Sequence, residues 1–223
     1  MPSTYRLPIF PIPLVLLPRA VQALHIFEPR YRQLLTDCRT GAMEFGIVCR
    51  TPDVAEREIP PGTAGCVARI DSSQSLPDGR SNVLVAGAAR FTLVNFVDDP
   101  APYHVALVEP FDDEPLEPHG ATGTGALSER LRELFARVGR SARALQDDAA
   151  PLPVLPDVAA DLAFVIATHI DLDLADKQRL LASRSPLDRL RQLDEALAPI
   201  VESIEERASI HVRAKSNGHG THA

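Results

Sequence analysis

Residues that could carry catalysis do not form a catalytic pattern in this chain of 223 residues. No nucleotide-binding loop of the form G-x-x-x-x-G-K-[ST] occurs, which argues against an ATPase. Lys177 lies six residues before Ser183, and in a helix that spacing places the two side chains on different faces. A Ser-Lys dyad would also need a structural context that is missing here. We therefore predict that the chain is not an enzyme and has no catalytic residues.

The sequence also gives little support for a metal-binding site. Five residues could contribute ligands from separate parts of the chain: His25, Cys38, Cys49, Cys66 and His104. Zinc sites usually show ligand pairs two to four residues apart, and no such pair is present among them. An odd number of cysteines without C-x-x-C spacing instead indicates small buried thiols in a reducing compartment. We predict no metal, no other cofactor and a cytoplasmic location.

A charged cluster around Glu28 and Arg30 permits two interpretations. These side chains could grip a partner beside an apolar loop. They could equally form an internal ion pair that fixes the loop, where loss of one charge would leave the other poorly solvated. Packing more often explains such a pattern, so the structural role is favoured and the binding role stays open.

Apolar residues interrupted by prolines surround this cluster. Prolines lack a backbone N–H and suit edge strands or extended loops, so we expect an incompletely buried apolar patch here. Such patches on proteins tend to mark interaction sites. The candidate partner-binding residues are Pro13, Leu16, Leu17, Ile26, Phe27, Glu28 and Arg30.

The elements that must position these residues are mostly short strands. Residues 7–12 read as an edge strand, and Pro29 is well placed to begin a helix with Tyr31, Leu34 and Leu35 on its apolar face. Further strands are predicted at residues 43–50, 63–71, 80–86, 91–97 and 103–109. With turn signals between them and one capping helix, they predict an antiparallel β pseudo-barrel.

The second half of the chain is predicted to be helical. After an acidic, proline-rich stretch, apolar residues recur at helical spacing, and Pro199 should kink or divide the last helix. The predicted fold class is therefore α+β, with a C-terminal α-helical bundle. The predicted division is a β-rich subdomain at residues 1–112, a linker at 113–125, a helical subdomain at 126–209 and a disordered tail at 210–223.

Ordered motifs along nearly the whole chain resemble the N-terminal, substrate-binding domain of Lon proteases. The longest is Leu-His-Ile-Phe-Glu-Pro-Arg-Tyr-Arg at residues 24–32, preceded by Leu-Pro-Ile-Phe-Pro at residues 7–11. Later matches fall at residues 45–48, 62–63, 78–80, 87–91, 102–103, 175–181 and 187–190. The sequence departs at Arg19, where the family usually carries a glycine after the proline, and this bears only on the local turn.

The resemblance implies a PUA-like β unit and a non-catalytic module, free-standing from the ATPase and peptidase modules of Lon. It would bind unfolded polypeptides or a specific protein partner, which it could recruit for proteolysis. The alternative is RNA binding through the PUA-like fold, supported best by Arg30, Arg32 and Arg39. A net charge of −7 argues against nucleic acid, and no apolar run approaches the ~20 residues needed to span a membrane.

Overall fold

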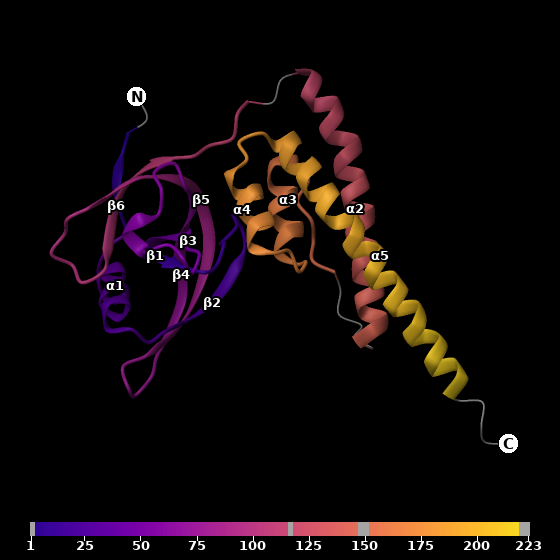
Figure 1. Cartoon of the computed structure of the whole chain (residues 1–223), viewed down its shortest axis with the longest axis horizontal. Helices are drawn as coiled ribbons and strands as arrows, with labels where there is room; N and C mark the ends of the chain where they lie inside the picture. The colour runs from indigo at the N-terminus through magenta and orange to yellow at the C-terminus, as the bar shows by residue number, and fades with distance from the viewer. Residues whose placement is uncertain (1–2, 116–117, 147–151, 219–223) are drawn as a thin grey trace. The chain divides into compact units, whose positions relative to one another are not determined.

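A computed structural model of the chain describes residues 3–115, 118–146 and 152–218 (Figure 1). Strands dominate the first half of the chain and helices the second. In chain order the elements are β1 (Tyr5–Ile12), β2 (Val21–Ile26), α1 (Pro29–Thr40), β3 (Glu44–Cys49), the 3-10 helix η1 (Glu56–Glu58), β4 (Ala64–Ser75), β5 (Ser81–Val97), β6 (His104–Pro110), α2 (Pro118–Gln146), α3 (Ala159–Thr168), α4 (Leu174–Ala182) and α5 (Pro186–Gly218).

The chain divides into two compact units. The first comprises Met1–Glu114 and Ala167–Arg184, and the second comprises Pro115–Ile166 and Ser185–Ala223. The β-rich unit therefore includes a helical segment that we expected to belong to the helical subdomain. Helix α2 begins at Pro118, inside the stretch expected to be a linker, and α5 continues to Gly218, inside the expected tail. Residues 219–223 lie outside the described part of the chain.

The sheet of the first unit has six strands in the order β2-β5-β4-β3-β1-β6. β1 and β3 pair in parallel, from Ile9 opposite Gly46 to Ile12 opposite Cys49. All other pairs are antiparallel, so the sheet is mixed where we expected an antiparallel one. The reason is the connection: β2 and α1 intervene between β1 and β3, which gives the long crossover that a parallel pair needs.

Strand β6 closes the sheet at one end, because it pairs with both β1 and β5. Its pairing with β1 stops at Ile9, and its pairing with β5 covers only the second half of that strand. The first half of β5 carries β2 on the corresponding edge. In the described residues, β2 therefore has one neighbour only, and residues 10–12 of β1 have a strand on one side only. The barrel is left open between these two segments.

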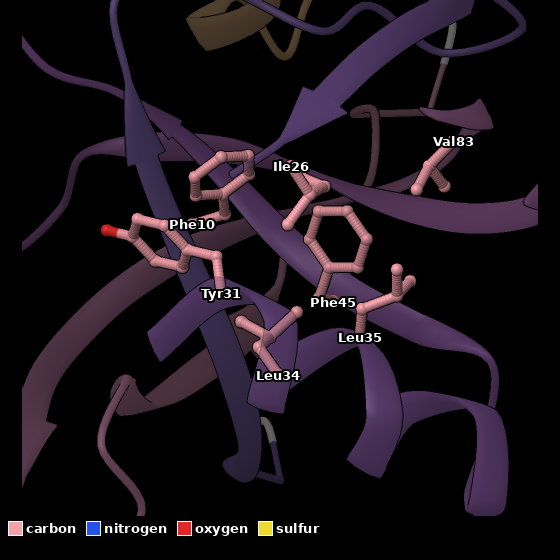
Figure 2. Close-up of a pocket in the computed structure, with 7 residues that line it drawn as sticks. All are labelled: Phe10, Ile26, Tyr31, Leu34, Leu35, Phe45 and Val83. Atoms are coloured by element: carbon pink, nitrogen blue, oxygen red, sulfur yellow. The ribbon is translucent and has the colours of Figure 1, made fainter. Parts of the chain in front are cut away.

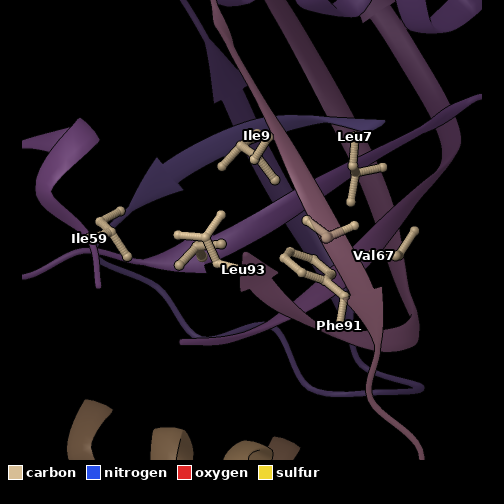
Figure 3. Packing of buried hydrophobic residues seen from close by; sticks show 9 residues of the cluster. Leu7, Ile9, Ile59, Val67, Phe91 and Leu93 are labelled. Atoms are coloured by element: carbon tan, nitrogen blue, oxygen red, sulfur yellow. The ribbon is translucent and has the colours of Figure 1, made fainter. Parts of the chain in front are cut away.

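The β unit is organised around a buried apolar core that draws on five strand segments and Ile59 (Figure 3). Phe91 lies at its centre with no exposed surface. A Cβ atom at Gly46 would stand 2.7 Å from the Phe91 ring, and one at Gly65 would stand 2.4 Å from it. The two glycines therefore leave the space that this ring fills.

The loop from β1 to β2 is pinned against β5 at Gly87. The amide of Arg19 donates to the Gly87 carbonyl at 2.8 Å, and the Gly87 amide donates to the Ala20 carbonyl at 2.8 Å. A Cβ at Gly87 would stand 2.0 Å from the carbonyl oxygen of Leu17. β5 runs through Gly87 as one strand, and its register opposite β4 shifts between Gly87 and Arg90, as a bulge there would give.

Arg90 of β5 holds α4 within the first unit. Its guanidinium donates to the carbonyls of Leu181 at 2.8 Å and Ser183 at 2.6 Å, and it pairs with Asp113. Arg90 also lies over the ring of Phe111, 4.8 Å from its centroid. These contacts explain why the segment after α3 belongs to the β unit.

The second unit contains two long helices side by side, α2 and α5 (Figure 1). Arg130 bonds to Asp194 and Arg137 to Glu205, so the two helices run parallel. Pro199 lies within α5, which is one helix, so the proline does not divide it. Across the described ranges, none of the helices has the length and apolar character required to cross a bilayer.

Candidate functional site

A groove lies at the opening of the barrel, between β1 and β2. We call it the β1–β2 groove, and its volume is about 320 Å³. Its walls come from the end of β1, from β2 and the turn after it, and from three residues beyond. The lining residues are Phe10, Pro11, Ile12, Pro13, Leu24, His25, Phe27, Glu28, Tyr31, Arg50 and Glu56.

Phe27 is the main exposed apolar side chain of this groove, with 56% of its surface accessible. Its ring stacks on His25 with centroids 6.2 Å apart and an interplanar angle of 25°. The Nε of Arg32 donates to the Phe27 carbonyl at 2.7 Å, which fixes the backbone at this turn. Ile26, the last residue of β2, is buried, and the alternation of side chains along an extended segment turns Phe27 to the surface.

The floor of the groove separates it from the interior of the β unit. Phe10 packs on Tyr31 with ring centroids 4.2 Å apart. Behind them lie Ile26, Leu34, Leu35, Phe45 and Val83 (Figure 2). Figure 2 shows the Tyr31 ring with its hydroxyl oxygen directed away from this apolar group. That hydroxyl reaches Glu56 at 3.4 Å.

Arg30 and Glu56 form an ion pair below the rim of the groove. Nη1 and Nη2 of Arg30 donate to the two Glu56 oxygens at 2.6 and 2.8 Å, and Nε donates to Glu28 at 3.0 Å. His104 Nε2 lies 2.7 Å from Glu56. Burial acts to raise the pKa of Glu56, but the bonds from Arg30 and His104 outweigh it and lower that pKa below its ordinary value.

The cluster at Glu28 and Arg30 is therefore built from internal ion pairs. Each of the three guanidinium nitrogens of Arg30 has a carboxylate partner within the chain. Burial, followed by the charge of Glu56, raises the pKa of Tyr31. A further role of Glu28 or Arg30 in partner binding stays a prediction.

Arg50 differs from the other charged residues of the groove. Its Nη1 donates to the Val54 carbonyl at 3.2 Å. Its Nε is buried without a hydrogen-bond partner, and within the described contacts Arg50 has no ion pair. Among the described contacts, the Arg50 guanidinium therefore lines this groove without a directly bonded carboxylate.

Three of the apolar residues predicted to form an exposed patch are buried. Leu16 is 1% exposed, Leu17 is 2% exposed and Ile26 is 5% exposed. The prediction of an incompletely buried patch was wrong for these three, because the bonds at Gly87 hold the loop against β5 and Ile26 points inward from β2. Pro13 and Phe27 are exposed and line the groove.

Sequence reasoning missed several groove residues. Phe10 was interpreted as a strand residue, Tyr31 as a helix residue and Leu24 only as part of a family motif, none with a place at a site. Arg50 was read as the end of a strand. One signal was available for it: a lone arginine directly after a buried apolar strand, followed by the loop that contains Glu56.

The groove and its surroundings offer little to metal or thiol chemistry. Where the structure describes the chain, no three His, Cys, Asp or Glu residues come close enough together to hold a metal ion. All three cysteines are free thiols. Burial raises the pKa of Cys38 to about 11 and that of Cys66 to about 12, so both thiols stay protonated near neutral pH.

The arginines that best supported RNA binding are held by internal contacts. Arg30 is paired with Glu56, and Arg32 donates to the carbonyls of Phe27 and Asp78. Arg39 donates to the hydroxyl of Ser73. These contacts direct the three side chains to separate partners and give no joint surface for a phosphate backbone.

Comparison with known proteins decides the family. The sequence matches the ATP-dependent protease La (LON) substrate-binding domain over residues 6–198. This chain belongs to the Lon substrate-binding domain family. Among similar proteins is the Lon protease of Geobacter metallireducens, 30% identical over 153 residues, which cover 69% of this chain and 18% of that protein. The Lon protease of Syntrophomonas wolfei is 28% identical over 219 residues, covering 96% of this chain and 26% of that protein.

Two solved structures of Lon N-terminal domains share the fold. The Lon N-terminal domain protein from Xanthomonas campestris is 26% identical, with a TM-score of 0.57, and the match covers 85% of this chain and 96% of that one. The N-terminal domain of the Mycobacterium avium complex Lon protease is 18% identical, with a TM-score of 0.66, covering 87% and 98%. The predicted fold class and the family resemblance are confirmed.

The Lon match is a match to one domain. The chain spans about a fifth of the length of the first curated relatives that it matches. The matched Lon domain is the substrate-binding one and not the peptidase one. Membership therefore identifies a substrate-recognition module, and partners and activity beyond that are matters of proposal.

Proposed function

We propose that this chain is a non-catalytic module that binds polypeptides through the β1–β2 groove and recruits them for proteolysis. Unfolded chains are the proposed partners, with a specific protein partner as the narrower case. The proposed location is the cytoplasm, in keeping with three unpaired cysteine thiols.

The observation that carries this proposal is the position of Phe27. A half-exposed aromatic ring stands at the rim of a groove with an apolar floor, in a member of a substrate-binding family. Exposed aromatic side chains beside a pocket are typical anchors of protein interfaces. Pro13 on the opposite wall is exposed as well, so an apolar side chain of a partner would contact both.

The charged residues have a supporting role in this proposal. Arg30 and Glu56 fix η1 against α1 and thereby hold the wall of the groove. Glu28 contributes a partly exposed carboxylate at the rim, where it can meet polar groups of a bound chain.

Fluorescence anisotropy of the purified protein tests the proposal. Two labelled ligands are compared at low and moderate salt: an unstructured apolar polypeptide and a structured RNA. We expect the polypeptide to bind at both salt concentrations, since apolar contacts are weakly screened. Binding of RNA that collapses with salt, without polypeptide binding, would overturn the proposal in favour of a nucleic-acid module. Absence of binding to both ligands would also overturn it for unfolded chains.

A further inference from the structure

We propose that the β1–β2 groove takes an extended polypeptide segment as an added β-strand on the outer edge of β2. This inference rests on the proposed function and specifies the form of the ligand. The bound segment would enter the opening of the barrel and form main-chain hydrogen bonds with β2. It would present one apolar and one acidic side chain to the groove.

Within the described residues, the pairing of β2 leaves alternate backbone groups without a partner strand. Gly87 of β5 donates to Ala20, directly opposite it, and in an antiparallel pair hydrogen-bonded positions recur at every second residue. By this alternation Gln22 and Leu24 face β5 with their backbone groups. The backbone groups of Val21, Ala23 and His25 face the outer edge.

One side-chain contact agrees with this assignment. The amide nitrogen of Gln22 donates to the carbonyl of Ala23 at 2.9 Å. A carbonyl already used in the ladder with β5 would be a poorer acceptor for that contact. The side chains of Val21, Ala23 and His25 are exposed, and in the described residues no strand pairs with this edge of β2. An uncovered strand edge of this kind is a template for another strand.

The opposite wall of the groove, formed by β1, cannot pair with an added strand in the same way. Residues 10–12 of β1 pair with β3 on one side and have no strand on the other. Pro11 and Pro13 both lack a backbone N–H, so this wall offers few backbone hydrogen-bond donors. A bound segment would therefore take its hydrogen bonds from β2 and its side-chain contacts from β1. Phe10 of β1 and Ile26 of β2 line one small cavity below the groove (Figure 2).

The side chains of the groove restrict what the segment carries. Phe10, Leu24 and Phe27 provide apolar walls. Glu28 and Glu56 share the single positive charge of Arg30, whereas the guanidinium of Arg50 has no carboxylate partner in the described contacts, so the site for an acidic side chain is beside Arg50. Charge complementarity therefore favours an acidic side chain on the segment.

The length of the segment follows from the length of β2. Val21–Ile26 has six residues, so a paired segment of similar length extends about 20 Å at ~3.3 Å per residue. Side chains two positions apart lie on the same face of a strand. The proposed ligand is thus an extended segment with an apolar residue and an acidic residue two positions from it.

A set of labelled hexapeptides tests strand addition. The parent peptide carries one Leu and, two positions later, one Asp among Ser and Thr residues. Two derivatives are methylated on alternate backbone nitrogens. One carries the methyl groups at the odd-numbered positions of the peptide and the other at the even-numbered positions. We expect one derivative to bind about tenfold or more weakly than the parent, because its methyl groups replace the N–H donors that face β2. The other derivative should bind about as well as the parent, because its methyl groups point away from β2.

Variants of the protein test the same geometry from the other side. Ala23→Pro removes an outward N–H without touching the pairing with β5, and Ala23→Ser is its matched control. We expect both variants to unfold cooperatively, and only Ala23→Pro to lose peptide binding. Arg50→Gln should weaken binding of the parent peptide and leave a peptide with Asn in place of Asp unchanged.

Failure of this inference can be told apart from failure of the proposed function. Suppose that the apolar polypeptide binds. Strand addition is then overturned, and polypeptide binding stands, if both methylated derivatives bind like the parent or if the parent hexapeptide does not bind. If neither the polypeptide nor any peptide binds, both are overturned. Equal binding of Asp and Asn peptides to the unmodified protein would remove the acidic residue from the proposed ligand.

Discussion

Arg30 and Glu56 are 26 positions apart in the chain and are joined by two parallel hydrogen bonds of 2.6 and 2.8 Å. The pair connects the first turn of α1 to η1, and His104 extends it to β6. The loop containing Glu56 has few other bonds to α1, so this ion pair is the main polar link between that loop and the helix beside the groove.

Replacing Glu56 by Gln should therefore destabilise the protein. The side chain of Glu56 is 19% exposed and that of Arg30 is 32% exposed, so both are partly shielded from water. We expect a loss of about 2 kcal/mol in the free energy of unfolding, the usual scale for hydrogen bonds to charged groups. Urea denaturation of Glu56→Gln, Arg30→Gln and the double variant measures this. Strict additivity of the two single effects would contradict a direct coupling.

The same pair predicts a dependence of stability on pH. Because the pKa of Glu56 is lower in the folded protein than its ordinary value of 4.5, its contribution is complete above that value. It is lost as the pH falls through the folded pKa. The difference in Tm between the unmodified protein and Glu56→Gln should be constant near neutral pH and shrink below about pH 4.5. A difference that grows on acidification would refute this sign.

Arg19 offers a stabilising substitution. Its φ angle is +68°, in the left-handed region that favours glycine. Arg19→Gly should raise stability by up to about 1 kcal/mol, the difference between relieved strain and the added freedom of the unfolded chain. Thermal melts compare it with Arg19→Ala, which keeps the strained backbone and should not stabilise.

Arg90 should be much more sensitive than a surface arginine. It is 7% exposed and bonds to Leu181, Ser183 and Asp113. Arg90→Met should cost about 3 kcal/mol or more, because two carbonyls and a carboxylate lose their donor. Hydrogen exchange of α4 should rise before that of the strands. Arg57→Met is the control, since its pair with Asp98 is exposed, and it should stay within about 0.5 kcal/mol.

The sequence predicted the strands and helices well where local patterns decide them. The helix start at Pro29 and the positions of β1, β3, β4 and β6 followed from proline chemistry and apolar periodicity. β2 was not predicted, and β5 is one strand where two were expected. Pairing across the chain was harder. The parallel β1–β3 pair and the return of α4 to the β unit depend on contacts between distant residues, such as Arg90 with Leu181, which no local pattern encodes.

Of the seven candidate binding residues, four lie in or beside one groove, and their role in binding stays a prediction. Pro13, Phe27, Glu28 and Arg30 do lie in or beside one groove. The burial of Leu16 could not be read from the sequence, because an apolar loop residue looks alike whether it faces solvent or a glycine on another strand.

The most direct test of polypeptide binding at the β1–β2 groove is the anisotropy assay with Phe27→Asp. The matched control is Val212→Asp, because Val212 is 54% exposed and Phe27 is 56% exposed, and Val212 lies on α5 in the second unit. Both variants should keep the Tm of the unmodified protein within a few degrees. We predict that Phe27→Asp loses binding of the apolar polypeptide by at least about tenfold while Val212→Asp retains it. Unchanged binding by folded Phe27→Asp would contradict the assignment of this groove as the binding site.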